Sequence, residues 1–325
     1  MLANGRRIGA HLALGPGMVK AADRAAEIGA SALQVFSDNP TAWRRRAALP
    51  RELPAFLDRL RTHDIAPLAI HAPYLANLAT PDDEVHDRSV ALLINELRVA
   101  QDYGAAYLNV HIGSHRGAGV EAGTERVAAA ISRVFRALDG DAPDPVLVLE
   151  NGAGGGFGLG MTIEELAAID TAIADAGVPR DRFAFCLDTA HAWGAGYAIN
   201  SEAGVDDLLV QIDRSIGLGR FRMVHLNDSR ADLGSRADRH EHLGAGRIGA
   251  AGIRRIVTHP DLGHVTYYLE TPGMDVGYDA VNIARVHDIV AGRPLPVLPD
   301  AAFEARNVKG RSAPADDDAV PVAGD

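Results

Sequence analysis

The amino-acid sequence predicts a single-domain α/β protein with the fold of a (β/α)8 TIM barrel. Three observations predict it: eight short apolar runs, helical periodicity between them, and a length of 325 residues, which suits one large core. The alternative is an open doubly wound sheet. That fold needs a glycine-rich dinucleotide turn after its first strand, and the Gly-Pro-Gly at residues 15–17 matches such a turn poorly.

The strands are expected where apolar residues run almost without interruption, as in parallel strands covered on both faces. In chain order, the eight runs are residues 6–14, 32–37, 67–74, 106–113, 145–151, 183–191, 222–228 and 267–272. Helical periodicity between them is clearest in residues 19–30, 88–105, 124–138 and 161–177. In the last of these segments, Thr162 is followed three residues later by Glu165, which is the pattern of a capping box.

The composition bounds the rest of the chain. Residues 1–306 are expected to form the barrel domain, and the Pro-, Ala- and Asp-rich residues 307–325 a disordered tail. The single cysteine, Cys186, excludes a disulfide framework and suits the reducing cytoplasm. No window has the length of a membrane helix, and the N-terminus does not resemble a signal peptide. We therefore expect a cytoplasmic protein without a membrane partner, and a monomer.

Ionisable residues gather at the C-terminal ends of the expected strands, where barrel enzymes carry their chemistry. The third to eighth strands each end in His, Glu or Asp, the sixth run carries both Asp188 and His191, and the loop after the seventh adds two more. These nine residues are His71, His111, Glu150, Asp188, His191, His225, Asp238, His240 and Glu270. A single histidine at a strand end is most often structural, but nine such groups at one barrel mouth would have a large desolvation cost without cations. Because catalytic zinc takes about three protein ligands, nine ligands with one shared fit three ions.

The charge of the chain has two aspects. A formal net charge of −11 argues against a nucleic-acid partner. However, arginines follow the expected strands on the same face as the nine residues, in the stretch WRRR (43–46) and at Arg116, Arg230, Arg236, Arg239 and Arg247. An anionic partner could therefore meet a locally cationic rim on a protein that is acidic overall.

Four motifs resemble endonuclease IV, the trinuclear-zinc AP endonuclease family: LENGAGGGFGLG (149–160), CLDTAHAWGAGY (186–197), HLNDSRADLGSRADRHEHLGAGRIG (225–249) and LETP (269–272). The resemblance runs from about residue 6 to about residue 290. It implies a nuclease of base excision repair. Such an enzyme hydrolyses the phosphodiester 5′ to an abasic site in double-stranded DNA and leaves a 3′-hydroxyl and a 5′-deoxyribose phosphate.

The resemblance also implies three zinc ions per chain. The first ion would be held by His71, His111 and Glu150. The second would share Glu150 and add Asp188, His225 and Glu270, and the third would be held by His191, Asp238 and His240. Glu150 and Glu270 are implied as catalytic residues, since Glu150 would hold two ions together and Glu270 could orient the nucleophile. His11 and His115 lie near the expected mouth and could support the ligands through hydrogen bonds.

Contacts to DNA are implied in the same way. Tyr74 and Leu75 resemble the family's wedge into the base stack, and Arg236 and Arg239 are expected to face the phosphate backbone. The glycines at 244–249 are expected to let the chain approach that backbone closely. Asp38 and Thr41 stand in a loop where the family often has a basic or long polar residue, which predicts a weaker grip on the duplex there.

Two other functions are kept open. A metal-dependent sugar isomerase or epimerase on a similar barrel uses two acids and two histidines around one divalent metal, and needs neither the Asp238–His240 pair nor an arginine rim. A non-catalytic DNA-binding barrel would need no cluster of nine ligands. Metal content distinguishes the nuclease from the isomerase, since about three zinc ions per chain support the nuclease and one supports the isomerase.

Overall fold

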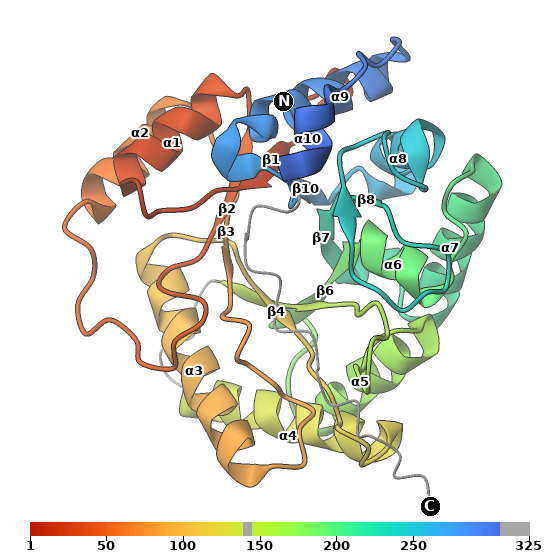
Figure 1. Ribbon diagram of the computed structural model, residues 1–325. Helices are drawn as coiled ribbons and strands as arrows, with labels where there is room; N and C mark the ends of the chain where they lie inside the picture. Colours follow the sequence, from red (N-terminus) through yellow and green to blue (C-terminus); the bar gives the residue numbers. More distant parts are fainter. Residues whose placement is uncertain (139–144, 306–325) are drawn as a thin grey trace, which may run out of the picture.

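A computed structural model describes residues 1–138 and 145–305, and its strands close into an eight-stranded parallel barrel (Figure 1). The strands are β1 (Ile8–His11), β2 (Ala32–Val35), β3 (Leu68–His71), β4 (Tyr107–His111), β5 (Val146–Glu150), β6 (Phe183–Asp188), β7 (Phe221–His225) and β10 (Thr266–Leu269). Each pairs with the next in parallel, and β10 pairs with β1 to close the barrel. The predicted fold is confirmed, and every strand overlaps its predicted run.

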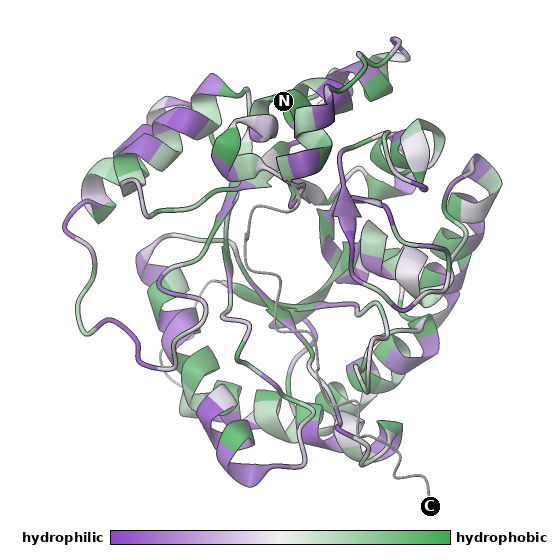
Figure 2. Ribbon diagram, in the orientation of Figure 1, coloured by the Kyte–Doolittle hydropathy of each residue, from purple (hydrophilic) through white to green (hydrophobic). Residues whose placement is uncertain are grey.

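The helices surround the barrel in Figure 1. They are α1 (Met18–Glu27), α2 (Leu53–Thr62), α3 (Asp83–Asp102), α4 (Val120–Ala137), α5 (Ile163–Asp175), α6 (Thr189–Ala195), α7 (Glu202–Ser215), α8 (Gly249–Thr258), α9 (Tyr278–Ala291) and α10 (Asp300–Glu304). Short 3-10 helices are η1 (Leu218–Arg220), η2 (Pro260–Leu262) and η3 (Met274–Val276). Figure 2 shows hydrophobic and hydrophilic residues alternating along the outer helices, as expected for helices with one face packed against a sheet.

The core has two parts. The larger one lies between the helices and the outer face of the barrel, where apolar side chains such as Phe56, Leu93 and Ile131 are fully buried. A smaller one fills the barrel interior below the mouth and includes Cys186 and Tyr268. Burial raises the pKa of Cys186 to about 11, as expected for a cysteine in the core rather than a reactive thiolate.

Local structure at the start of α5 follows the predicted capping box. The Thr162 hydroxyl accepts a hydrogen bond from the Glu165 amide at 3.2 Å. The Glu165 carboxylate in turn accepts from the Gly160 and Met161 amides at 2.8 and 2.9 Å. These bonds satisfy amides that a helix start leaves without a partner, and they fix the loop that leads from β5 into α5.

The ends of the chain bear on two predictions. Within residues 1–138 and 145–305, no helix is long and apolar enough to cross a membrane. The predicted tail, residues 307–325, lies outside the described residues, as does Arg306 at the expected domain boundary.

One further pairing builds the mouth of the barrel. After β7, the chain forms a short antiparallel hairpin of β8 (Asp228–Ser229) and β9 (His240–Glu241), in which Asp228 faces Glu241 and Ser229 faces His240. This hairpin, the loop between its strands and the segment that follows it to the start of α8 are called the metal loop below (residues 228–249). The metal loop rises from the C-terminal end of the barrel beside α6 (Figure 1).

Candidate metal centre

The register of the barrel brings the predicted ligands together. His111 on β4 is the direct neighbour of Glu150 on β5, and Asp188 on β6 is the direct neighbour of His225 on β7. Ligand atoms within 4.8 Å of one another form three overlapping groups. The groups are His71, His111 and Glu150; Glu150, Asp188, His225 and Glu270; and Asp188, His191 and His240.

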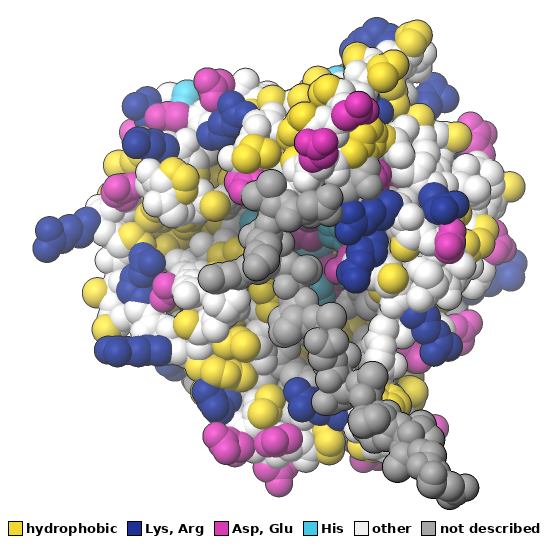
Figure 3. Space-filling view, in the orientation of Figure 1, with side chains coloured by type: hydrophobic (Ala, Val, Ile, Leu, Met, Phe, Trp, Pro, Cys, Tyr) yellow, Lys and Arg dark blue, Asp and Glu magenta, His cyan; other side chains and the backbone are white. Residues whose placement is uncertain are grey.

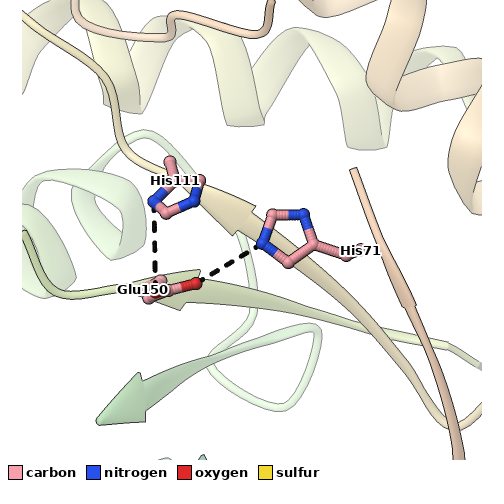
Figure 4. A group of neighbouring side chains, drawn as sticks. All are labelled: His71, His111 and Glu150. Carbon is pink, nitrogen blue, oxygen red and sulfur yellow. Dashed lines mark ion pairs between the residues drawn. The ribbon is translucent and has the colours of Figure 1, made fainter. Parts of the chain in front are cut away.

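The first group comes entirely from strand ends (Figure 4). The Nε2 atom of His71 lies 3.7 Å from Glu150 Oε2, and the Nδ1 atom of His111 lies 4.0 Å from Glu150 Oε1. Figure 4 shows both rings directed at the carboxylate from β3 and β4. The Glu150 side chain is fully buried, so this arrangement places a charge where solvent cannot compensate it.

The second group centres on His225. Its Nδ1 atom lies 3.3 Å from Glu150 Oε2, 3.4 Å from Glu270 Oε2 and 3.9 Å from Asp188 Oδ2. Three carboxylates thus surround one ring nitrogen, and Glu150 belongs to both the first and the second group. This matches the sharing of Glu150 that the family resemblance implies.

The third group joins a helix to the metal loop. Asp238 places Oδ2 at 3.3 Å from His191 Nε2 and Oδ1 at 3.1 Å from His240 Nε2. Asp188 also contributes, because its Oδ2 lies 3.6 Å from His240 Nε2. Asp188 was expected only in the second group; the strand end of β6 sets it between the second and third groups.

The histidines are held with one ring nitrogen free. The Nδ1 atoms of His71, His191 and His240 lie 2.7 to 2.8 Å from backbone carbonyl oxygens, of Ala72, Asn151 and Glu270 respectively, to which they donate. For His225 the donor is Nε2, at 3.0 Å from the Gln34 side-chain oxygen. A hydrogen bond on one nitrogen fixes the tautomer and leaves the other nitrogen as a lone-pair donor, as in metal-ligating histidines.

Several atoms of the candidate ligands are buried without any hydrogen bond. Within the described residues they include Glu150 Oε1, His225 Nδ1 and His240 Nε2, all of which face the cluster. A buried polar atom without a partner has a desolvation cost of about 1–3 kcal/mol, and more when charged. Cations among these atoms would remove that cost, so the residues present fit a metal centre.

The shifted pKa values show that the charged forms of these carboxylates and histidines are favoured, so the carboxylates attract positive charge. Burial raises the pKa of Glu150, but His111 and His225 outweigh it, and the pKa lies well below the usual range. Burial lowers the pKa of His240, but Asp238 and Asp188 outweigh it and raise the pKa to about 10. His191 is shifted in the same direction, since Asp188 and Asp238 exceed the effect of burial on its pKa. The carboxylates therefore attract cations of any kind to this site.

Polar residues on neighbouring strands support the ligands, and the sequence did not single them out. The Gln34 amide donates to Glu270 Oε1 at 2.7 Å, and the Asn109 amide donates to Glu150 Oε2 at 2.6 Å. The Asn227 amide donates to Asp188 Oδ2 at 2.7 Å. Each of them interrupts or ends an apolar strand run, and a polar residue inside such a run was the signal that could have revealed them.

The two histidines expected to support the ligands differ in the structure. His11 Nδ1 lies 2.9 Å from Glu270 Oε1, so His11 does contact a ligand. His115 instead accepts a hydrogen bond from the Gly119 amide and packs its ring against Phe157, with ring centres 5.5 Å apart. It forms part of the outer rim, because the chain has already turned away from the barrel axis at that point.

The glycines of the metal loop surround a buried carboxylate. The amides of Gly244, Gly246 and Gly249 all donate to the buried carboxylate of Asp228, at 2.9 to 3.3 Å. A Cβ atom on Gly246 would collide with Asp228 Oδ1 and with the Ser229 carbonyl oxygen. Gly246 therefore permits close approach of the loop to an internal anion, and the approach of these glycines to a phosphate stays a prediction.

The residues expected to contact DNA surround this centre. The ring of Tyr74 lies 5.7 Å from the His71 ring and 6.1 Å from the His111 ring, and its side chain is 38% exposed. Leu75 beside it is half-buried, and Arg236 and Arg239 are exposed on the metal loop. Figure 3 shows Lys and Arg side chains beside a hollow in which His side chains are visible.

Not all of the expected arginine rim is available. Arg45 donates from Nε to Glu96 Oε1 at 2.8 Å, and the Glu96 side chain is fully buried. Asp38 accepts from the backbone amide of Arg46 at 2.8 Å and thereby folds its own loop. The pairing of Arg45 was not visible in the sequence, because Glu96 lies on α3 more than 50 residues away.

Comparisons with known proteins agree with this geometry. The profile of the xylose isomerase-like TIM barrel family matches residues 22–290. A probable endonuclease 4 of Methanoculleus marisnigri is 43% identical over 87% of this chain and 98% of its own length. The crystal structure of endonuclease IV from Thermus thermophilus is 36% identical, with a TM-score of 0.75 over 88% of this chain and 99% of that one. An L-ribulose 3-epimerase shares the fold, with a TM-score of 0.60 at 18% identity, and covers 93% of this chain and 92% of that one.

Proposed function

The chain belongs to the endonuclease IV family, and we propose that it is a zinc-dependent AP endonuclease of base excision repair. In this proposal it hydrolyses the phosphodiester 5′ to an abasic site in double-stranded DNA, leaving a 3′-hydroxyl and a 5′-deoxyribose phosphate. The observation that carries the proposal is the convergence of His, Asp and Glu side chains into three overlapping groups at the barrel mouth. Oxygen and nitrogen ligands of this kind are those that zinc takes in catalytic sites.

The charge balance supports three ions rather than one. The three groups contain the carboxylates of Glu150, Asp188 and Glu270, and Asp238 adds a fourth beside His191 and His240. A single divalent ion would leave the buried cluster negative and repel a phosphate, whereas three divalent ions make it positive. The site then attracts a phosphodiester even though the whole chain carries −11.

The chain's own residues hold and orient the reacting groups. Bound zinc supplies the Lewis acidity that activates a water near neutral pH and offsets the charge developing on the phosphate. Glu150 lies between the first and second groups and so keeps them at a fixed separation. Glu270 is anchored through Oε1 by His11 and Gln34. Its other oxygen thus faces the cluster, where it orients the attacking water. Asp238 and His240 act on the side of the leaving 3′ oxygen.

Selectivity for abasic sites would come from the neighbouring wedge. An abasic nucleotide has already lost its base stacking, so its extrusion from the duplex costs less than that of an intact one. Tyr74 and Leu75 stand at the edge of the metal centre, with Tyr74 exposed enough to reach a bound duplex. We assign them to the gap left by the extruded nucleotide, and Arg236 and Arg239 to the phosphate backbone.

The isomerase alternative is weaker. The epimerase resemblance is at 18% identity and therefore concerns the fold alone. A site with one metal would use one of the three groups and leave buried ligand atoms such as His240 Nε2 without a partner.

Three further properties belong to the proposal. We propose a monomer, because all three ligand groups form within one chain, and a cytoplasmic enzyme, in keeping with the single buried cysteine. We also propose that residues 1–306 are the catalytic domain. A chain shortened to Arg306 is then expected to keep its melting temperature and turnover, and a fall of more than about 5 °C, above 1 kcal/mol for a chain of this size, would contradict that boundary.

The test combines metal analysis with cleavage. The purified protein is analysed for zinc and incubated with a 5′-labelled duplex containing one abasic site, with the intact duplex as control. About three zinc ions per chain and a labelled product ending in a 3′-hydroxyl are expected. A single metal ion per chain, or cleavage of neither duplex by the zinc-loaded protein, would overturn the proposal.

A further inference from the structure

The last described segment of the chain packs against the base of the metal loop. This segment, residues 293–305, is called the C-terminal strap. It lies beyond residue 290, where the family match ends, and it contains α10, which Figure 1 shows next to α9. Ala302 in α10 is fully buried, whereas its neighbour Ala301 is exposed. The strap is thus docked on the domain through one defined face.

The first contact runs through His242. This residue lies two positions after the candidate ligand His240 and is fully buried. Its Nε2 atom donates to the Ala302 carbonyl oxygen at 2.9 Å, and its ring meets the Phe303 ring edge-on with centres 6.1 Å apart. Its Nδ1 atom accepts from the Asn282 amide at 2.9 Å, which fixes the tautomer needed for the bond to the strap.

A second contact runs through α9. Arg285 donates from Nε to the Leu243 carbonyl oxygen of the metal loop, and from Nη1 to the Pro296 carbonyl oxygen of the strap at 2.8 Å. Its guanidinium therefore bridges the two segments. In addition, the Leu295 side chain lies so close over Gly244 that a Cβ atom at that glycine would collide with it.

These contacts lie on residues 242–244, directly after the loop residues Asp238 and His240 in the chain. The ring of His240 is tied to the end of β10 by its hydrogen bond to the Glu270 carbonyl oxygen, whereas Asp238 is 55% exposed and the two-residue strand of His240 lies outside the barrel sheet. We propose that the C-terminal strap is a positioning element for this part of the site, and that His242 transmits its hold to Asp238 and His240. The consequence for zinc rests on the proposed function, whereas the hold on the loop backbone does not.

A pair of neighbouring alanines gives a matched test. Ala302→Asp buries a charge in the docked face of α10 and releases the strap, whereas Ala301→Asp adds the same charge on the exposed face. Hydrogen exchange is measured on the metal-free proteins for the amides of residues 238–246. Faster exchange there in Ala302→Asp, but not in Ala301→Asp, is expected. Equal exchange in both variants would overturn the inference whatever the function of the site.

The same pair is then loaded with zinc and titrated with a chelator. Ala302→Asp is expected to release one of its ions about tenfold or more readily than Ala301→Asp, with the remaining ions unchanged, since weakening the support of a ligand typically costs ten- to a hundredfold in metal affinity. Identical release of all ions would overturn the positioning role. Absence of zinc from the Ala301→Asp control and the unmodified protein would instead count against the proposed function.

A second pair tests His242 and remains usable if Ala302→Asp does not fold. His86 is the matched control, because it is also buried, and its Nε2 likewise donates to a backbone carbonyl, that of Arg126, at 3.0 Å, away from the metal loop. His242→Leu is expected to loosen one zinc ion and to speed exchange in residues 238–246, and His86→Leu is expected to change neither. His242→Gln, which keeps a donor near Ala302, is expected to restore part of both effects. Equally easier zinc release and equally faster exchange in both leucine variants would reject a specific role for His242.

Discussion

The two ends of the metal centre are built in different ways. His71, His111 and Glu150 stand on the last residues of three adjacent barrel strands, and their separation follows from the register of the sheet. Asp238 and His240 belong to the metal loop, whose position depends on a separate set of buried contacts. The Glu150 side chain is fully buried, whereas the Asp238 side chain is 55% exposed.

The difference shows that the register of the barrel sheet by itself places the ligands at neighbouring strand ends next to one another. Parallel strands place their last side chains side by side, since the ladder of backbone hydrogen bonds sets the register. A loop ligand has no such ladder and needs an internal frame. Here Asp228 gathers several loop amides on its carboxylate, and the C-terminal strap contacts the loop at His242.

The largest expected effect is at the strand-borne end. Glu150→Gln keeps the shape of the side chain but removes the charge shared by two ligand groups. We expect loss of bound zinc and a fall of at least about 10³-fold in the cleavage of an abasic duplex, because the pair of ions loses its bridge. Zinc analysis and a single-turnover assay measure the two effects. Cleavage within about tenfold of the unmodified protein would remove Glu150 from its assigned role.

The loop-borne end is expected to fail separately. Asp238→Asn removes one charge from the third group, so one ion is expected to be lost while the others stay. We expect kcat to fall by about 10²-fold, the scale of losing one stabilising contact to a developing oxyanion. Zinc content measured by mass spectrometry under native conditions decides the matter. If all ions were lost together, the centre would bind metal as one cooperative unit, which would contradict the distinction between its strand-borne and loop-borne ends.

Asp228 holds the metal loop together, and we expect it to affect stability and zinc affinity although it is not itself a predicted ligand. Asp228→Asn turns a donor toward the amides of Gly244, Gly246 and Gly249, so the loop loses charge-assisted hydrogen bonds. We expect a loss of about 2 kcal/mol in the free energy of unfolding, and one zinc ion released about tenfold more readily. Asp232→Asn is the control, because Asp232 is exposed and pairs at the surface with the exposed Arg247. Equal effects in the two variants would refute the frame.

The sequence predicted more of the strand-borne end of the metal centre than of the loop-borne end. Near-continuous apolar runs predicted every strand of the barrel but not the hairpin of β8 and β9, and polar residues at the strand ends pointed to His71, His111 and Glu150. The family resemblance was needed to group Asp238 with His191. The hold of Asp228 on the glycines and of Ala302 on His242 could not be predicted, since both are contacts between distant residues that leave no periodic trace. Similarly, Gln34 and Asn109 were passed over because strand periodicity highlights their apolar neighbours.

The smallest expected effect concerns the grip on DNA rather than the metals. Tyr74 and Leu75 follow the strand-borne His71, whereas Arg236 belongs to the metal loop, so the proposed DNA contacts also differ between the two ends of the centre. If Tyr74 and Leu75 fill the gap left by an extruded nucleotide, they stabilise the bent complex without touching the reacting phosphate. Their joint replacement by alanine is expected to weaken binding of abasic duplex about tenfold, as the loss of one stacking contact does, and to leave zinc content intact.

Arg236→Ala sharpens this contrast, because a phosphate contact carries no preference for a damaged site. It is expected to weaken binding to abasic and intact duplex alike and to reduce the salt dependence by about one phosphate contact. Binding titrations of both duplexes at several salt concentrations separate the two variants. If the Tyr74→Ala, Leu75→Ala protein kept its preference for abasic over intact DNA, recognition would lie elsewhere. The loop that contains Thr41 would then be the next candidate, since Asp38 already folds it into a defined shape beside the strand ends.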